Sequence, residues 1–454
     1  MPAWKDHLEA HRKDAVAALE DLLAIPSVST DPAYKEHCNE AADWVQARLE
    51  DMGLEARQVV IDGGHPVVVG RFDAGHDKPT VTLYGHYDVQ PPDPIDAWTT
   101  PPFEPTIEDG RIRARGATDD KGQMLANLLA IEAHAKTGSL DVNLNVLIEG
   151  EEEMGGKSLP TFIQRNKEAL QSDGVFVSDT HLWDEEHPSI VHGMRGIVTL
   201  EATVTGPERD MHSGQWGGIV MNPAEALAKA IATLKDDDLH VQIPGFYDDV
   251  LELDEEQREL MAKVPFSEER LLDESGVPEL AGEAGFDSQE RLWARPSLEI
   301  NGIASGYAGD GFKTVLPGTA TVKISSRIVP NQDAEAIAES ILDHLEAHLP
   351  PGVTLEGNVL QTTGAWYVPP GHEVLKLAAD CLSNVWGGET YFIREGATIP
   401  VVPDLGELGP VALMGYGMTD ERLHAPDEFF RLDHFHKGTQ AFGHVLEEMA
   451  KRGA

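Results

Sequence analysis

Residues 144–156 constrain the fold more than any other stretch, because a short apolar run ends there in three consecutive carboxylates. The run Leu144–Ile148 is rich in aliphatic residues, which is typical of a buried strand. Glu151, Glu152 and Glu153 follow, and a glycine pair closes the segment. Carboxylates at the mouth of a buried strand repel one another and favour protonation unless a cation lies nearby. Taken alone, the segment would more often be a solvated acidic turn than part of a metal site.

Three further apolar runs lead to a residue that could bind a metal ion. They are 81–84 followed by His86, 175–177 followed by Asp179, and 411–414 with His424 some residues later. In open α/β sheets, ligands bind outside the carboxyl ends of the strands. Imidazoles and carboxylates gathered at such ends could share a hard or borderline divalent cation. The repeated pattern therefore predicts one metal-binding crevice and favours the metal site over the solvated turn.

The chain has 454 residues, which is too long for a single hydrophobic core. Up to about residue 194, strands alternate with helices, which predicts an α/β fold class with a doubly wound, mostly parallel sheet. Residues 196–205 and 315–329 alternate at period 2, which is typical of half-exposed antiparallel strands. We therefore expect a smaller α+β domain, 195–365, inserted into a first domain made of 1–194 and 366–454.

The composition excludes several classes of function. Apolar residues make up 41% and charged residues 25% of the chain, and no apolar stretch is long enough to span a membrane. The formal net charge of −43 argues against nucleic acid and anionic membranes as partners, and it suits either a high-salt habitat or a very soluble enzyme. The N-terminal residues lack an apolar signal core, and Cys38 and Cys381 are not in a metal-binding spacing. We expect a cytoplasmic protein without disulfide bonds.

Six segments, in this order along the chain, resemble the signature segments of the M20 metallopeptidases. The closest resemblance is to the dipeptidase branch, which includes carnosinase-like enzymes. The segments are Gly85–Pro91 (GHYDVQP), Arg115–Gly122 (RGATDDKG), Glu149–Glu153 (EGEEE), Asp210–Gly214 (DMHSG), Ser326–Pro330 (SRIVP) and Arg394–Pro400 (REGATIP). Because six segments match in order, the resemblance covers nearly the whole chain.

The resemblance implies a pair of divalent metal ions, most commonly zinc, with manganese or cobalt as alternatives. Asp119 would bridge the two ions. One ion would also bind His86 and Asp179, and the other Glu153 and His424. Each ion would then have three protein ligands and a position for water, which is typical of a catalytic site. The resemblance also implies a cis peptide bond between Asp119 and Asp120.

Two acidic residues would support the chemistry of this centre. Asp88 lies two residues from His86, so both side chains point to one face of an extended strand. By resemblance, Asp88 supports the ligand histidine, which sets its tautomer and basicity. Glu152 matches the general base, which would take a proton from water and pass it to the leaving amine. Glu151 occupies a position that need not be acidic, and we expect no role for it.

The inserted domain would complete the site as a lid and dimerisation domain. By resemblance, His212 stabilises the oxyanion from the partner subunit of a homodimer, and Arg327 binds the terminal carboxylate of the substrate. The backbone between Gly396 and Thr398 would complete this clamp. Ala397 and Thr398 stand where carnosinase-like relatives tend to have glycine and serine, so this departure leaves the substrate range open.

Three functions follow from these motifs. The first is a dinuclear metal hydrolase that cleaves dipeptides or short peptides with free carboxyl ends. The second is an amidohydrolase of N-acyl or N-carbamoyl amino acids, which would use the same site residues. The third is a non-catalytic binding or scaffold protein of the same fold, which predicts loss of Glu152 or of a metal ligand. None of these residues is lost.

Overall fold

A computed structural model describes residues 2–452 of the chain, which forms two compact units. Unit 1 contains the chain up to His192, then Val368–Ile393 and the chain from Ile399 onward. Unit 2 contains Gly193–Tyr367 and the short segment Arg394–Thr398. That short segment lies outside the expected inserted range of 195–365, and it places Gly396 and Thr398 in the same unit as Arg327.

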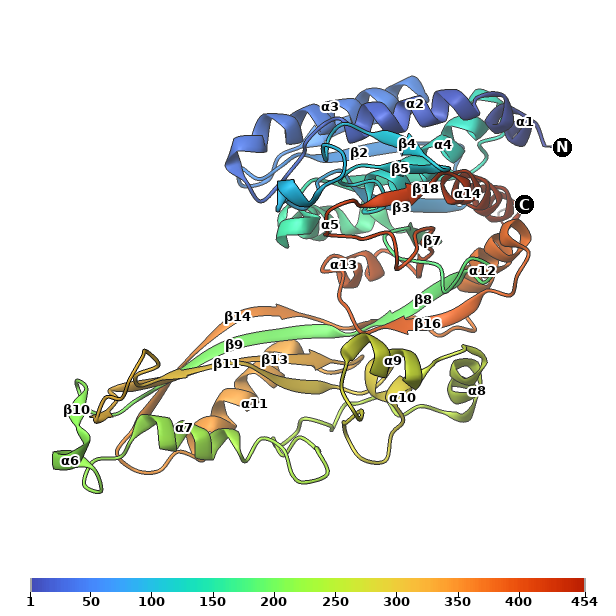
Figure 1. Cartoon of the computed structure of the whole chain (residues 1–454). Helices are drawn as coiled ribbons and strands as arrows, with labels where there is room; N and C mark the ends of the chain where they lie inside the picture. The colour runs from blue at the N-terminus through green and yellow to red at the C-terminus, as the bar shows by residue number, and fades with distance from the viewer. Residues whose placement is uncertain (1, 453–454) are drawn as a thin grey trace. The chain divides into compact units, whose positions relative to one another are not determined.

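Unit 1 is built on a sheet whose centre is parallel (Figure 1). The strand order is β1-β2-β6-β3-β7-β17-β8, and β16 also pairs with β8. Strands β6, β3, β7 and β17 are parallel to one another, whereas β1, β2 and β8 are antiparallel to their neighbours. The bounds are β1 Glu55–Val59, β2 Val67–Phe72, β3 Thr80–His86, β6 Asn143–Glu149, β7 Gly174–Val177, β8 Ser189–Met194, β16 Tyr391–Glu395 and β17 Val411–Leu413. The predicted fold class is confirmed.

Helices pack against this sheet and against one another. Helix α3 (Lys35–Asp51) packs on β1 and β2, and α4 (Lys121–Lys136) packs on β3 and on α14 (Leu432–Arg452). Helix α4 is buried almost all round from Lys121 to His134, because it lies between the sheet and other helices. The other helices are α1 Ala3–Ala10, α2 Arg12–Leu23, α5 Ser158–Asn166, α12 Glu373–Trp386 and α13 Val402–Gly406. Apolar residues recur at helical spacing from Trp4 to Leu23, which predicts one helix, but the structure interrupts it at His11, so this prediction is wrong.

A smaller sheet in unit 1 carries the chain toward His424. It has the order β18-β5-β4, with β4 Thr106–Glu108, β5 Arg111–Arg113 and β18 Phe429–Arg431. Strands β4 and β5 form a hairpin around Gly110. Because β18 pairs with β5, the loop before β18 is brought next to the segment that follows β5.

Unit 2 has an antiparallel sheet of order β11-β13-β9-β14, packed on one face by α7 and α11 (Figure 1). Strand β9 alternates between buried and partly exposed residues, as its period-2 pattern predicts. The bounds are β9 Gly196–Thr205, β11 Ser297–Ser305, β13 Thr319–Ile328 and β14 Thr354–Thr363, with α7 Pro223–Ile231 and α11 Ala334–Ala347. Strands β11 and β14 were not predicted, because their exposed residues break the apolar alternation.

The remaining elements of unit 2 are short. They are β10 Met211–His212, β12 Val315–Leu316, β15 Trp366–Tyr367, α6 Ser213–Trp216, α8 Glu255–Lys263, α9 Glu268–Ser275 and α10 Ser288–Trp293. Helices α8 and α9 lie in the acidic segment between residues 254 and 283. Across residues 2–452, no helix is both long and apolar enough to cross a lipid bilayer.

Candidate metal centre

The carboxyl ends of three neighbouring strands form the base of the candidate centre. His86 is the last residue of β3 and pairs in register with Glu149, the last residue of β6. Asp179 follows the end of β7 on the other side of β3. Parallel strands end at the same edge of a sheet, so these side chains meet where α/β folds commonly bind ligands.

Five residues converge there in two groups that share Asp119. The first group is His86, Asp119 and Asp179, and the second is Asp119, Glu153 and His424. Within each group the potential ligand atoms all lie within 4.8 Å of one another. His86 Nε2 lies 3.2 Å from Asp119 Oδ1 and 3.8 Å from Asp179 Oδ2. His424 Nε2 lies 2.8 Å from Asp119 Oδ2 and 3.4 Å from Glu153 Oε2.

The electrostatics of these residues fit a pair of cations. Burial and the charge of Asp119 raise the pKa of Asp179 to about 6 and that of Glu153 to about 9. Burial opposes ionisation of Asp119 too, but the hydrogen bond with His424 and the nearby imidazole of His86 hold its pKa below the usual value. His86 Nε2 is buried and makes no hydrogen bond, although it faces two carboxylates. Divalent cations would relieve the carboxylate repulsion and coordinate this nitrogen, so the residues fit a dinuclear centre.

Asp88 ties the two groups together. His86 Nδ1 lies 3.1 Å from the Asp88 carbonyl oxygen and 3.4 Å from its Oδ1. The same carboxylate accepts hydrogen bonds from the backbone amides of Glu152 at 3.3 Å and Glu153 at 3.1 Å. Asp88 is fully buried, so water cannot replace these contacts. Asp88 therefore orients a histidine of the first group through its carbonyl oxygen and carboxylate, and the backbone of a carboxylate of the second through its carboxylate.

Gln90 is a functional candidate that the sequence did not reveal. Its Nε2 donates to Glu153 Oε2 at 2.7 Å, which fixes one carboxylate oxygen of Glu153. Gln90 lies in the motif segment 85–91, two residues after Asp88, and that position was the only signal available in the sequence.

Glu428 holds the loop that carries Asp119. Its Oε1 accepts from the backbone amides of Thr118 at 3.0 Å and Asp119 at 3.2 Å. Its Oε2 accepts from Gly116 N at 3.0 Å and from Arg115 Nη1 at 2.7 Å. Glu428 is fully buried and lies more than 300 residues from this loop along the chain, so nothing local in the sequence indicated the contact. The Asp119–Asp120 peptide is cis, as the resemblance implied.

Glu151 corrects an expectation. It was expected to have no role, but it is buried, and its carboxylate accepts from His65 N at 2.7 Å and Ser158 N at 3.2 Å. These bonds hold the glutamate loop onto the rest of unit 1. Glu152 begins the short 3₁₀ turn Glu152–Met154. Burial, together with the nearby carboxylates of Asp179 and Glu153, raises the pKa of its carboxyl group well above the usual value.

Unit 2 contains the other predicted residues. Arg327 Nη1 donates to Thr398 Oγ1 at 3.0 Å, and Gly396 lies in the same segment as Thr398. The hydroxyl of Thr398 therefore occupies a defined position in the predicted clamp. His212 is exposed, and its Nδ1 accepts from Gly214 N at 3.0 Å at the start of α6. The ring of His212 is exposed, which leaves it accessible to another molecule. Its role toward a partner subunit stays a prediction.

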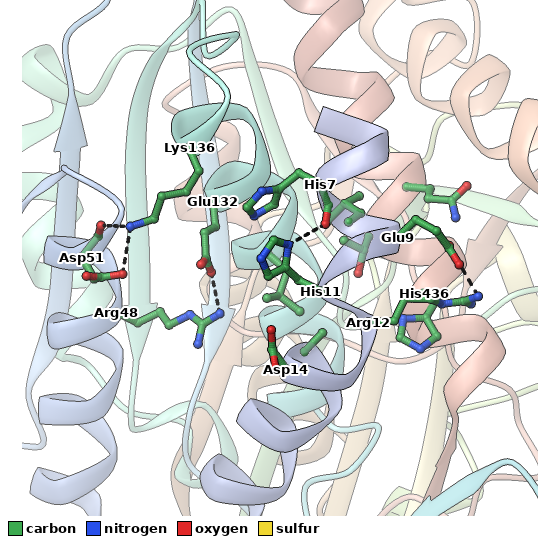
Figure 2. A pocket seen from close by; sticks show the side chains of 15 residues that line it. His7, Glu9, His11, Arg12, Asp14, Arg48, Asp51, Glu132, Lys136 and His436 are labelled. Carbon is green, nitrogen blue, oxygen red and sulfur yellow. Dashed lines mark hydrogen bonds and ion pairs between the residues drawn. The ribbon is translucent and has the colours of Figure 1, made fainter. Parts of the chain in front are cut away.

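A separate cavity of about 390 Å³ lies among helices of unit 1 (Figure 2). It is lined by residues of α1, α2, α3, α4 and α14, and none of the five convergent residues lines it. Two of its cations are already paired, Arg48 with Glu132 at 2.5 Å and Lys136 with Asp51 at 3.0 Å. Because these cations are already paired with carboxylates, they do not indicate which ligand the cavity could bind.

Known proteins resemble the chain over nearly its whole length. Residues 82–448 match the model of peptidase family M20/M25/M40. The chain is 31% identical to "Cys-Gly metallodipeptidase dug1" of Schizosaccharomyces pombe, covering 98% of this chain and 97% of that protein. It is also 31% identical to the human "Beta-Ala-His dipeptidase", covering 98% of this chain and 92% of that protein.

A solved structure extends this similarity. The M20 family metallo-carboxypeptidase Sso-CP2 from Sulfolobus solfataricus has a TM-score of 0.83 and 33% identity, and the match covers 96% of this chain and 99% of that one. The resemblance inferred from six motif segments is therefore confirmed by the family match, by relatives and by fold. With the metal-ligand geometry in unit 1, these comparisons show that the chain is an enzyme of peptidase family M20/M25/M40.

Proposed function

We propose that this enzyme is a metal-dependent dipeptidase that cleaves peptides with a free C-terminal carboxylate at a dinuclear centre. The convergence of His86, Asp119, Asp179, Glu153 and His424 into two groups that share one carboxylate carries the proposal. Relatives about 31% identical over almost the full length are named Cys-Gly and β-Ala-His dipeptidases, which favours dipeptides as substrates. These relatives also favour peptide hydrolysis over the alternative of N-acyl or N-carbamoyl amino acids.

Two divalent ions would be held by these five residues, with Asp119 between them. The donors are imidazole nitrogens and carboxylate oxygens without thiolate, a set that suits zinc and also manganese or cobalt. Bound there, the ions supply Lewis acidity that makes water a nucleophile near neutral pH.

The residues of the chain move the proton and hold the ligands. Glu152 accepts the proton from the attacking water and delivers it to the leaving amine. A raised carboxyl pKa suits this exchange, because the group must both take and return a proton near neutral pH. Asp88 keeps His86 and the Glu152–Glu153 backbone oriented during the reaction.

Unit 2 supplies substrate recognition in this proposal. Arg327 binds the terminal carboxylate through its guanidinium group, and the backbone of the Gly396–Thr398 segment completes this clamp. His212 stabilises the oxyanion from the partner subunit of a homodimer. Exposed apolar residues of unit 2 such as Phe312, at 90% exposure, and Ile219, at 77%, support burial of part of this surface by a second copy. Residues 1–194 and 366–454 would thus be catalytic, and 195–365 would form the lid and dimer interface.

A carboxypeptidase is the second candidate. It is favoured by the 33% identity to a protein described as a metallo-carboxypeptidase. Both activities need a free C-terminal carboxylate, so the same clamp serves either. They differ in whether the substrate may extend beyond two residues.

The test combines metal analysis with a substrate panel. We expect about two divalent ions per chain in protein purified without chelator, and loss of activity after chelation that is restored by zinc or manganese. The panel compares dipeptides, tripeptides, N-acetyl amino acids and dipeptide amides. Preferential cleavage of dipeptides supports the proposal, whereas equal cleavage of longer peptides indicates the carboxypeptidase. Cleavage of N-acetyl amino acids alone would contradict both.

The expected cytoplasmic location stays a prediction, supported by two buried, unpaired cysteines.

A further inference from the structure

Arg195 and Arg327 point to the same face of the sheet in unit 2. Arg327 on β13 pairs in register with Ile197 on β9, and Arg195 lies two residues before Ile197. Residues two apart along an extended strand share a face, and diagonal neighbours across a strand pair lie about 7–8 Å apart. The core of unit 2 packs on the other face, where Val198 and Ile328 are buried. The two guanidinium groups therefore lie near each other, on the face of the sheet opposite α7 and α11.

The Gly396–Thr398 segment lies between these two side chains. Thr398 Oγ1 accepts from Arg327 Nη1 at 3.0 Å and donates to the Arg195 carbonyl oxygen at 2.5 Å. Arg195 Nε donates to the Gly396 carbonyl oxygen at 3.3 Å, and Arg195 N donates to the Glu395 carbonyl oxygen at 3.2 Å. A Cβ atom on Gly396 would lie 2.8 Å from Arg195 Nη2, so glycine leaves the space that the guanidinium fills.

Neither guanidinium has an anionic partner. Within residues 2–452, no carboxylate oxygen lies within 4.0 Å of Arg195 or Arg327. The carboxylate that most influences Arg195, Glu299, lies 3.4 Å from Lys235. Burial and the charge of Arg327 lower the pKa of Arg195 to about 10.

Some other buried or partly buried arginines of the chain are neutralised in place. Arg295, for example, makes two hydrogen bonds to Glu283, at 2.8 and 2.6 Å, and Arg48 in the cavity of Figure 2 is paired with Glu132. The chain has 78 acidic and only 35 basic residues, so carboxylates are abundant. Arg195 and Arg327 are adjacent, partly buried cations without a carboxylate partner. Such a pair indicates a site that an external anion completes.

We propose that Arg195 is a second carboxylate-binding residue, so that the terminal carboxylate of the substrate is bound by Arg195 and Arg327 together. This inference rests on the proposed function and adds a residue that no motif identified. One carboxylate has two oxygens and about four acceptor positions, enough for two guanidinium groups and a backbone donor. Arg195 would also set the path of the Gly396–Thr398 segment, because its Nε and carbonyl oxygen hydrogen bond to Gly396 and Thr398 and its backbone amide donates to the preceding Glu395.

The experiment measures kcat and KM for the dipeptide Ala-Gly and for its C-terminal amide. Variants are Arg195→Gln, Arg195→Lys and Arg327→Gln, and Arg209→Gln, an exposed arginine of unit 2, is the matched control. We expect Arg195→Gln to raise KM for the free acid about 10-fold or more, with kcat nearly unchanged and little effect on the amide. Arg195→Lys should recover part of the loss, because it keeps the charge but not the planar fork. Metal content and melting temperature check that each variant is folded.

The outcomes separate this inference from the proposed function. If Arg195→Gln still discriminates acid from amide as the wild type does, while Arg327→Gln does not, the role of Arg195 is wrong and the proposed function stands. If the wild type cleaves acid and amide equally well, the carboxylate requirement itself fails. Should Arg195→Gln not fold, Arg195→Lys carries the same comparison of acid with amide, because it keeps the long side chain and its charge but loses the planar fork. If Arg195→Gln raises KM for Ala-Gly but not for its C-terminal amide, the proposal is supported. If the variant discriminates between acid and amide as the wild type does, the proposal is overturned.

Discussion

The backbone amide of Glu153 donates a hydrogen bond to Asp88 Oδ2 at 3.1 Å. Asp88 also lies against His86 Nδ1, so one buried carboxylate connects the β3 end to the glutamate loop. The two halves of the proposed dinuclear centre therefore depend on the same side chain, although His86 and Glu153 are 67 residues apart in sequence.

Replacing Asp88 should weaken metal binding. We expect Asp88→Asn to lower metal affinity about 10–100-fold, because partners of metal-binding histidines contribute on this scale. Competition with a chromogenic chelator measures the change. Asp96→Asn, at an exposed position of a nearby loop, is the control and should bind metal normally. Unchanged affinity in Asp88→Asn would remove Asp88 from the centre.

Replacing Glu152 should separate catalysis from metal binding. Glu152→Gln keeps the size of the side chain but cannot accept the proton, so we expect kcat to fall about 10²–10⁴-fold with metal content unchanged. Steady-state kinetics and elemental analysis on one preparation provide the check. Normal turnover in the variant would show that another group is the base.

Glu151, by contrast, should matter for stability. Glu151→Ala leaves the buried amides of His65 and Ser158 without an acceptor. An unsatisfied buried donor costs about 1–3 kcal/mol, so the free energy of unfolding should fall by at least this amount. Thermal or urea unfolding measures the loss. A variant as stable as the wild type would mean that water replaces both contacts.

Glu395 should make stability depend on pH. Burial raises the pKa of its carboxyl group to about 7 from a usual value of 4.5. The folded state then binds more protons than the unfolded state between these pH values, so its contribution to stability falls as pH rises through that window. We expect Glu395→Gln to raise the melting temperature at pH 8 but not at pH 4. Equal effects at both pH values would show that the carboxyl group is solvated.

His212 provides a test of the homodimer. If it acts on the partner subunit, neither His212→Ala nor Glu152→Ala should be active alone, yet mixed dimers contain one intact site. Refolding the two variants together should restore about a quarter of the wild-type activity, because about half of the dimers are mixed and each has one working site. Analytical ultracentrifugation confirms the oligomeric state. No recovery in a dimeric mixture would place His212 in its own subunit's site or outside catalysis.

The alternation of strands and helices was sufficient to predict the fold class of unit 1, because buried parallel strands and amphipathic helices have distinct periods. The same reasoning missed β11 and β14, whose side chains are mostly exposed and follow no simple apolar period. Periodicity also predicted one helix where the structure has α1 and α2, because the break at His11 leaves the apolar spacing intact.

The candidate ligands could be predicted because each follows a strand end or lies in a motif segment. The contacts that support these ligands could not be predicted from the sequence. Gln90 and Glu428 have no distinctive local pattern, and Arg195 looks like an ordinary residue before a strand. Each acquires its role from a partner distant in sequence, such as the 309 residues between Asp119 and Glu428.

The sequence alone determined which residue types are available and which periods they follow, and therefore the family, the fold class and the identity of the candidate ligands. Only the tertiary structure decided which buried polar groups meet. A hydrogen bond needs its two atoms within about 3 Å, and that distance depends on how elements far apart along the chain pack, not on either residue's neighbours. For this reason the contacts of Glu151 and Arg195, and those of Asp88 with the glutamate loop, show only in the folded chain.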